Sequence, residues 1–166
     1  MRFLSETDSP LGKIILASDG SSLTGLWFFD QKNALRGLQK DAVSKDLIVF
    51  EEAKKWLKIY FSGKEPDFKV PLSYNDTPFR MEVWKILQEI PYGEVITYSD
   101  IAERITKQKG ISKMSAQAVG SAVGMNPISI LIPCHRVVGK DGDLHGYAGG
   151  LERKEKLLKL EQEKPW

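Results

Sequence analysis

The pattern of apolar residues changes near residue 77, and this change constrains the fold more than any other feature of the sequence. Before it, three short apolar-rich segments at residues 2–7, 13–18 and 23–29 are separated by the turn sequences DSPLG and DGSSL. Such segments predict the strands of an antiparallel meander. After it, apolar residues recur at helical intervals. The chain therefore predicts an α+β fold, with a small antiparallel sheet first and a mainly helical part second.

One helix is expected between the sheet and the change of pattern. Five residues share one helical face there: Val49, Ala53, Trp56, Leu57 and Tyr60. Ser62-Gly63 ends that pattern, as glycine commonly does after a helix. Residues 64–77 contain two prolines and no clear period, so we interpret them as a linker. The predicted domains are residues 1–77, which include the linker, and residues 78–166.

The second domain is predicted to be built mainly of helices. Thr77-Pro78 opens the first of them, because threonine caps helices and proline suits the first helical position. Thr97 and Asp100 have the spacing of a capping box, which predicts a short second helix. Ser115 is expected to cap a third helix made of small residues, and Leu151–Glu163 has the pattern of a final amphipathic helix.

The segments between these helices carry further signals. A basic loop is predicted from Thr106 to Lys113, which either contacts phosphates or is simply solvated. The apolar run at residues 128–133 predicts a strand that leads directly to Cys134. The capped short helix and the small-residue helix resemble a helix-turn-helix, although their connection of about eight residues exceeds the 3–4 typical of that motif.

Composition excludes several classes of protein. No apolar run approaches the roughly 18–20 residues of a membrane span, so no membrane partner is expected. One cysteine permits no internal disulfide, and with two histidines it cannot form a cysteine-rich structural zinc site. The N-terminal residues are too polar for a signal peptide, and the single cysteine leads us to expect a reducing, cytoplasmic location. The absence of heptads favours a monomer, and the net charge of +2 neither requires nor excludes nucleic acid.

Cys134 is the first candidate for chemistry. A lone cysteine is usually a small buried hydrophobe. Here Pro133 precedes it and His135 and Arg136 follow, and a base or a positive charge beside a thiol is what activates it as a nucleophile. Adjacent side chains of an extended strand point to opposite faces, so His135 needs a turn or a bridging water to reach the thiol.

Glu161 is the second candidate. It follows Leu157 by four residues and Leu158 by three, which places a carboxylate on or beside the apolar stripe of the last helix. Such a glutamate most often reaches solvent from the edge of the stripe. The alternative is a buried carboxylate that orients a histidine, as the third member of a nucleophile–base–acid relay.

A glycine-rich segment, Gly146–Gly150, lies between Cys134 and the last helix. Its glycines allow the backbone to approach another group closely and to move. It is either an ordinary loop or a lid with an aromatic wall supplied by Tyr147. His145 precedes it, and we expect this histidine at the edge of the lid, outside the relay.

The motif at residues 132–137, Ile-Pro-Cys-His-Arg-Val, resembles the signature of the O6-alkylguanine-DNA alkyltransferases. The resemblance extends from Pro78 to Glu161 through PFRMEVW, GEVITYSDIA, AVGSAVGMNPISILIPCHRVVG, GYAGG and KLLKLE. YFSGKEPDF in the first third also resembles the variable first domain of the family. The family implies a small ribonuclease-H-like domain, followed by a helical domain that carries a helix-turn-helix and the active-site loop.

The resemblance implies a DNA repair activity without a cofactor or a metal. Its partner would be double-stranded DNA containing O6-alkylguanine, and the resemblance leaves open whether O4-alkylthymine is a second substrate. Cys134 would accept the alkyl group irreversibly, in a single turnover. His135 would deprotonate Cys134 through a water, Glu161 would hold the histidine, and Asn126 would brace the active-site turn.

The resemblance also implies residues that bind the substrate. Tyr98 would press on the phosphate 3′ of the lesion. Tyr147 and Ala148 would wall the base pocket, with Tyr147 donating towards guanine O6. Gln117 stands where many relatives carry an arginine that fills the gap left by the flipped base. Pro133 and Arg136 would be structural residues of the active-site loop.

Other functions are open to this sequence. A non-catalytic alkyltransferase-like protein would bind the lesion without repairing it, but such proteins lack the acceptor cysteine. A Cys-His hydrolase or peptidase would need an oxyanion hole and turnover, and only the Cys-His pair favours it. A transcriptional regulator is least favoured, because no additional domain is recognisable.

Overall fold

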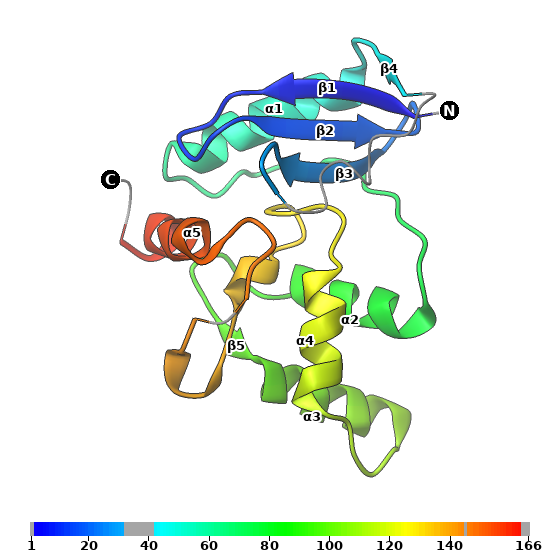
Figure 1. Cartoon of the computed structure of the whole chain (residues 1–166), viewed down its shortest axis with the longest axis vertical. Helices are drawn as coiled ribbons and strands as arrows, with labels where there is room; N and C mark the ends of the chain where they lie inside the picture. The colour runs from blue at the N-terminus through cyan, green and yellow to red at the C-terminus, as the bar shows by residue number, and fades with distance from the viewer. Residues whose placement is uncertain (1, 32–41, 145, 164–166) are drawn as a thin grey trace.

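A four-stranded sheet forms the N-terminal part of the computed structural model (Figure 1), which describes residues 2–31, 42–144 and 146–163. Its strand order is β3-β2-β1-β4. The strands β1 (Phe3–Thr7), β2 (Ile14–Ser18) and β3 (Leu23–Phe28) form the predicted antiparallel meander. His145, which we expected at the lid edge, lies outside the described residues.

Two further elements complete this part. The helix α1 (Ile48–Phe61) covers one face of the sheet and ends at Ser62-Gly63 as predicted. The short strand β4 (Val43–Ser44) pairs in parallel with β1 and was not predicted. Its two residues are both exposed, so they show no apolar alternation that a sequence pattern could reveal.

The helical part contains α2 (Pro78–Gln88), α3 (Tyr98–Lys109), α4 (Ala116–Gly124) and α5 (Leu151–Glu163). Their predicted N-caps are confirmed. Thr77 accepts a hydrogen bond from the Arg80 amide, and Ser115 accepts one from the Ala118 amide. In Figure 1, α4 crosses α3, as the helices of a helix-turn-helix do. The indole Nε1 of Trp84 on α2 donates to the Ala122 carbonyl, 2.8 Å away, and anchors α4.

The predicted basic loop is partly wrong, because α3 continues to Lys109. Lys107 pairs with Glu103 one turn earlier in α3, and Lys109 pairs with Glu82 of α2. These ion pairs favour continued helix, which then ends at Gly110 in the left-handed conformation. The connection to α4 is therefore residues 110–115, shorter than the sequence suggested.

The strand predicted at residues 128–133 is also wrong. Only Ile128 makes a bridge, to Leu26 of β3, and Ile130 has a φ of 72°, which no strand accommodates. The run is apolar because it is packed between the sheet and the helices, with Ile128, Ile130 and Ile132 all buried. Burial without alternation does not distinguish a strand from a buried turn.

Two short strands connect the helical part to the active-site loop. The strand β5 (Ile96–Thr97) pairs in parallel with β6 (Val137–Val138). Because β5 leads directly into α3 and β6 follows the turn Cys134–Arg136, this pairing brings the start of α3 beside Cys134. Val137 and Val138 are both buried, which fixes the strand pair in the core.

One continuous core joins the sheet and the helices. The predicted linker packs onto β3, where Leu23 donates its amide to the Pro71 carbonyl and accepts from the Ser73 amide. The sheet part and the helical part therefore pack against each other and share one core. Within the described ranges, every helix is too short or too polar to cross a bilayer.

Thr97→Ala is expected to lower the free energy of unfolding by about 1 kcal/mol. Thr97 accepts from the Asp100 amide, and the Asp100 carboxylate accepts from the Thr97 amide, so both halves of the predicted capping box are present. Urea denaturation measures the change. Thr97→Ser keeps the hydroxyl and is the control; equal losses in both variants would contradict a capping role.

Candidate active site around Cys134

Cys134 begins a single 3-10 turn, Cys134–Arg136, rather than continuing a strand. Asn126, which follows α4, stabilises the chain before this turn. Its Nδ2 donates to the Ile132 carbonyl at 2.7 Å, and its Oδ1 accepts from the Ile128 amide at 3.0 Å. Pro133 is buried next to them. One amide side chain thus supports both ends of the irregular segment that carries the cysteine.

The thiol of Cys134 is buried, with 5% of the residue exposed. Burial raises its pKa to about 11, and a hydrogen bond with Asn126 and the positive charge of Lys154 only partly oppose this. The thiol is therefore protonated at neutral pH. A reaction of its sulfur needs a base, because the thiolate is the nucleophile.

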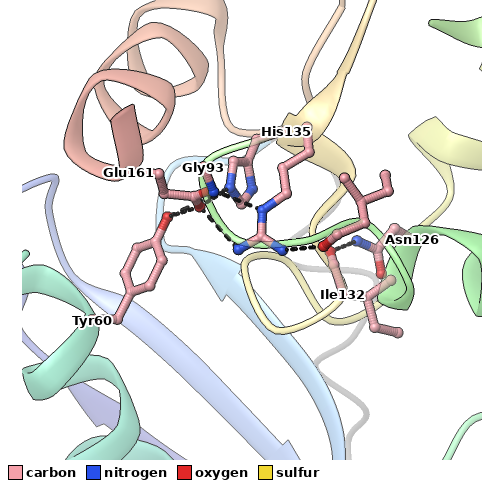
Figure 2. Close-up of polar contacts among 8 residues, drawn as sticks. Tyr60, Gly93, Asn126, Ile132, His135 and Glu161 are labelled. Atoms are coloured by element: carbon pink, nitrogen blue, oxygen red, sulfur yellow. Dashed lines mark hydrogen bonds and ion pairs between the residues drawn. The ribbon is translucent and has the colours of Figure 1, made fainter. Parts of the chain in front are cut away.

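The nearest candidate base, His135, is fully buried and paired with Glu161. Figure 2 shows the two side chains together, with 2.5 Å between His135 Nε2 and Glu161 Oε2. Burial lowers the pKa of His135 below its usual value, although the carboxylate opposes this shift. The imidazole is neutral at pH 7. Because Nε2–H donates its hydrogen bond to the Glu161 carboxylate, Nδ1 is left as the basic nitrogen. Nδ1 is buried and has no hydrogen-bond partner among the described residues.

Glu161 is the centre of the network in Figure 2. Its side chain is buried and paired with His135, so it does not reach solvent from the edge of the apolar stripe. Arg136 donates from Nε to Oε1 at 2.8 Å and from Nη2 to Oε2 at 3.2 Å. Tyr60 Oη donates to Oε2 at 2.6 Å, and the Gly93 amide donates to Oε1 at 3.1 Å. Burial alone would raise the pKa of this carboxyl, but His135 and Arg136 lower it to about 2.

Arg136 also ties this network to the helical part. Its Nη1 donates to the Ile90 carbonyl, 2.8 Å away, just after α2. Its guanidinium lies 5.7 Å from the ring centroid of Tyr92. The guanidinium thus balances the buried charge of Glu161 and holds the segment after α2 against the active-site turn.

Two side chains of this site were missed by the sequence analysis. Tyr60 was assigned to the apolar face of α1, but a buried tyrosine hydroxyl needs a partner, and that requirement was the available signal. Lys154 is completely buried, and burial lowers its pKa to about 8. It precedes Glu161 by seven residues, two helical turns, so its place on the buried face of α5 was also detectable.

A cavity of ≈ 850 Å³ opens between α3, α4 and the glycine-rich segment 146–150. All four residues expected to bind substrate line it: Tyr98, Gln117, Tyr147 and Ala148. Tyr98 comes from the start of α3 and packs against Gly120 of α4. Where α4 lines the cavity, it contributes mainly small residues, including Gly120, Ser121 and Gly124. A close approach of a large flat partner to this helix therefore meets little side-chain bulk.

Tyr98 and Tyr147 both interact electrostatically with Cys134. Burial raises the pKa of each phenol, and a charged Cys134 thiolate would raise both further. Both phenols are therefore protonated at neutral pH and can act as hydrogen-bond donors. Gln31, which follows β3, also lines the cavity. Gln31 is thus a third residue that the sequence analysis missed, and nothing in the sequence pattern indicated it.

No metal site is evident in residues 2–31, 42–144 and 146–163, where no three His, Cys, Asp or Glu side chains converge. The chemistry available to the described residues is that of a thiol nucleophile with a neutral histidine base. The histidine is oriented by a buried carboxylate. Such a relay suits attack on an electrophilic carbon held in the adjacent cavity.

Comparisons with known proteins give two family matches. A family model described as "6-O-methylguanine DNA methyltransferase, ribonuclease-like domain" matches residues 4–74. A second, described as "6-O-methylguanine DNA methyltransferase, DNA binding domain", matches residues 78–163. Together they span nearly all of the chain.

Individual relatives are similar over most of their length. A methylated-DNA–protein-cysteine methyltransferase of Methanosarcina barkeri is 45% identical over 159 residues, 93% of this chain and 94% of that protein. The protein of the same name from Haemophilus influenzae is 42% identical over 155 residues, 93% of this chain and 83% of that one. The crystal structure of Mycobacterium tuberculosis OGT in complex with DNA has a TM-score of 0.85 and 40% identity, over 98% of this chain and 94% of that chain.

Glu161→Gln is expected to lower the free energy of unfolding by roughly 3–5 kcal/mol, because it leaves the buried Arg136 guanidinium without its counter-charge. Urea denaturation at pH 7 measures the change, and Glu155→Gln, an exposed pair on the same helix, is the control.

The same substitution has a defined pH dependence. The pKa of Glu161 is lowered in the fold, so its stabilisation is complete above the ordinary value of 4.5 and is lost as the pH falls towards 2. The difference in stability between the wild type and Glu161→Gln should therefore shrink below about pH 4.5. A difference that is constant from pH 7 to pH 3 would contradict the ion-pair account.

Proposed function

The chain belongs to the 6-O-methylguanine DNA methyltransferase family, and from that premise we propose that it is a single-turnover DNA repair protein. It moves the alkyl group of O6-alkylguanine in duplex DNA to the sulfur of Cys134. The observation that carries the proposal is the arrangement of Cys134, His135 and Glu161, together with a cavity lined by Tyr98 and Tyr147, two tyrosines that interact electrostatically with Cys134. The cysteine also argues against a non-catalytic lesion-binding protein.

The reaction is an in-line displacement at the alkyl carbon. Glu161 accepts the hydrogen bond of His135 Nε2–H, and Nδ1 accepts the thiol proton of Cys134 through a water. The new S–C bond forms as the C–O6 bond breaks, and its electron pair goes to the guanine. Tyr147 donates a hydrogen bond towards O6, which stabilises the developing negative charge. The product is a thioether, which neither water nor a thiol readily cleaves, so one protein repairs one lesion.

The reacting carbon lies inside the duplex, so the nucleotide has to rotate out, at a cost of a few kcal/mol. The small residues of α4 allow close approach to the groove. Tyr98 presses on the phosphate 3′ of the lesion, and Gln117, which is exposed on α4, fills the space left by the base. An uncharged glutamine hydrogen-bonds the orphaned base but adds no attraction to the phosphates.

A division of labour between the domains follows from this proposal. Residues 78–166 bind DNA and accept the alkyl group, whereas residues 1–77 form the ribonuclease-like domain. The match to the first family model ends at residue 74 and the match to the second begins at residue 78, which supports a boundary near residue 77. A reactive thiol also needs reducing surroundings, which supports a cytoplasmic location. Cell fractionation tests the location.

Methyl transfer is tested by mixing the protein with an oligonucleotide that carries O6-methylguanine and measuring the intact mass. We expect a gain of one methyl group per protein, confined by peptide mapping to the Cys134 peptide. Cys134→Ser should abolish the gain while leaving DNA binding unchanged, because serine is a far weaker nucleophile in this setting. Transfer by the serine variant, or repeated turnover by the wild type, would contradict the proposal.

The pH dependence of transfer tests the histidine base. The lowered pKa of His135 keeps the ring neutral below pH 6.5, so the single-turnover rate should stay level from pH 7.5 to below 6.5 and fall only at lower pH. It should not rise towards pH 9, since the thiol pKa is about 11. DNA binding by Cys134→Ser over the same range is the control. A rise centred near the pKa of a free thiol would mean that no base is used.

A further inference from the structure

Arg153, near the start of α5, makes contacts with Leu11, Asp30 and Gly149 that have no part in the proposed reaction. Its Nη1 and Nη2 donate to the two carboxylate oxygens of Asp30, at 2.6 and 3.3 Å. Its Nε donates to the Leu11 carbonyl at 2.9 Å, and Nη1 also donates to the Gly149 carbonyl at 3.1 Å. Asp30 and Leu11 belong to the first domain, and Gly149 belongs to the glycine-rich segment 146–150.

We propose that the Arg153–Asp30 ion pair is a latch through which the first domain holds segment 146–150 in place over the substrate cavity. Arg153 and Asp30 are then positioning residues, because they touch neither the substrate nor Cys134 but set the positions of Tyr147 and Ala148. This inference rests on the proposed function. It gives the first domain a part in the reaction, although that domain supplies no reacting group.

The packing beneath the segment supports the latch. The Arg153 guanidinium lies 4.3 Å from the ring centroid of Phe28, the last residue of β3. Phe28 in turn lies against Gly149, where an added Cβ would come within 3.0 Å of its ring and 2.8 Å of the Tyr147 ring. Arg153, Phe28, Gly149 and Tyr147 are therefore in successive contact. A shift at the ion pair would be passed directly to the tyrosine that walls the cavity.

The chain around Asp30 reaches the cavity as well. Gln31, the next residue, lines it, and its Oε1 accepts from the Phe28 amide at 3.3 Å while its own amide donates to the Phe28 carbonyl at 3.0 Å. The turn at residues 28–31 thus supplies both the carboxylate of the latch, from Asp30, and one residue that lines the cavity, Gln31. Figure 1 shows α5 just below the sheet, where such a contact can form.

The ion pair is placed to position the segment rather than to stabilise the fold. The side chain of Asp30 is 51% exposed and that of Arg153 is 16% exposed. Half-exposed pairs contribute little to the free energy of unfolding, but the two-pronged geometry restricts the direction of the guanidinium. Loss of the pair should therefore change the segment without unfolding the protein.

The test compares Asp30→Asn with Asp30→Glu, which retains the carboxylate. Two properties are measured: hydrogen exchange of the amides in residues 146–154, and the single-turnover rate at increasing protein concentration. Two amides report directly, since Gly150 donates to the Tyr147 carbonyl and Lys154 donates to the Gly150 carbonyl. Glu152→Gln, which removes the exposed Glu152–Lys156 pair of the same helix, is the matched control.

Asp30→Asn should exchange faster at these amides only and should lower the maximal transfer rate roughly tenfold, with little change in the concentration that gives half of that rate. Asp30→Glu should restore most of the rate, and Glu152→Gln should resemble the wild type. Unchanged exchange in Asp30→Asn would overturn the latch, and so would faster exchange spread over the whole protein. If the wild type transfers no methyl group, the proposed function fails, while the exchange comparison still decides whether the latch exists.

Discussion

The buried carboxylate of Glu161 is the interaction on which the rest of the site depends. It accepts hydrogen bonds from Tyr60 of α1, from Gly93 after α2, and from Arg136 in the active-site turn, and it pairs with His135. These groups come from segments that are far apart in the sequence. A buried charge is tolerated only when all of its lone pairs are satisfied. The need to satisfy this one buried carboxylate therefore fixes the positions of α1, the segment after α2 and the active-site turn relative to one another.

This network also sets the chemistry of the thiol. Cys134 is buried and burial raises its pKa, so the thiol is protonated at neutral pH and is a weak nucleophile without a base. In the proposed reaction His135 activates the thiol: burial keeps its ring neutral, and the hydrogen bond of Nε2 with Glu161 leaves Nδ1 as the basic nitrogen. Because the protein reacts only once, a protonated thiol protects it from losing its single acceptor site to side reactions before the substrate binds.

The first domain contributes more than a covering for the helices. Tyr60 supports the carboxylate from α1, and Gln31 lines the cavity. The contacts of Arg153 link the same domain to the glycine-rich segment. Side chains from the sheet domain and from the helical part thus share one core and one cavity, although the family models treat the two as separate units.

The sequence by itself determined the meander, α1, the capped helices and the cysteine motif, because alternation, helical spacing and caps are local signals. It misplaced the strand at residues 128–133, since apolar content reports burial and not the φ of 72° at Ile130. It also missed β4 and the last turn of α3, whose stability depends on partners elsewhere in the chain. Only the tertiary structure decided that Glu161 is buried, that Tyr60 and Lys154 belong to the site, and that Asp30 meets Arg153. Those facts depend on contacts between residues up to 123 positions apart, and no local pattern records which of many polar side chains will share a buried space.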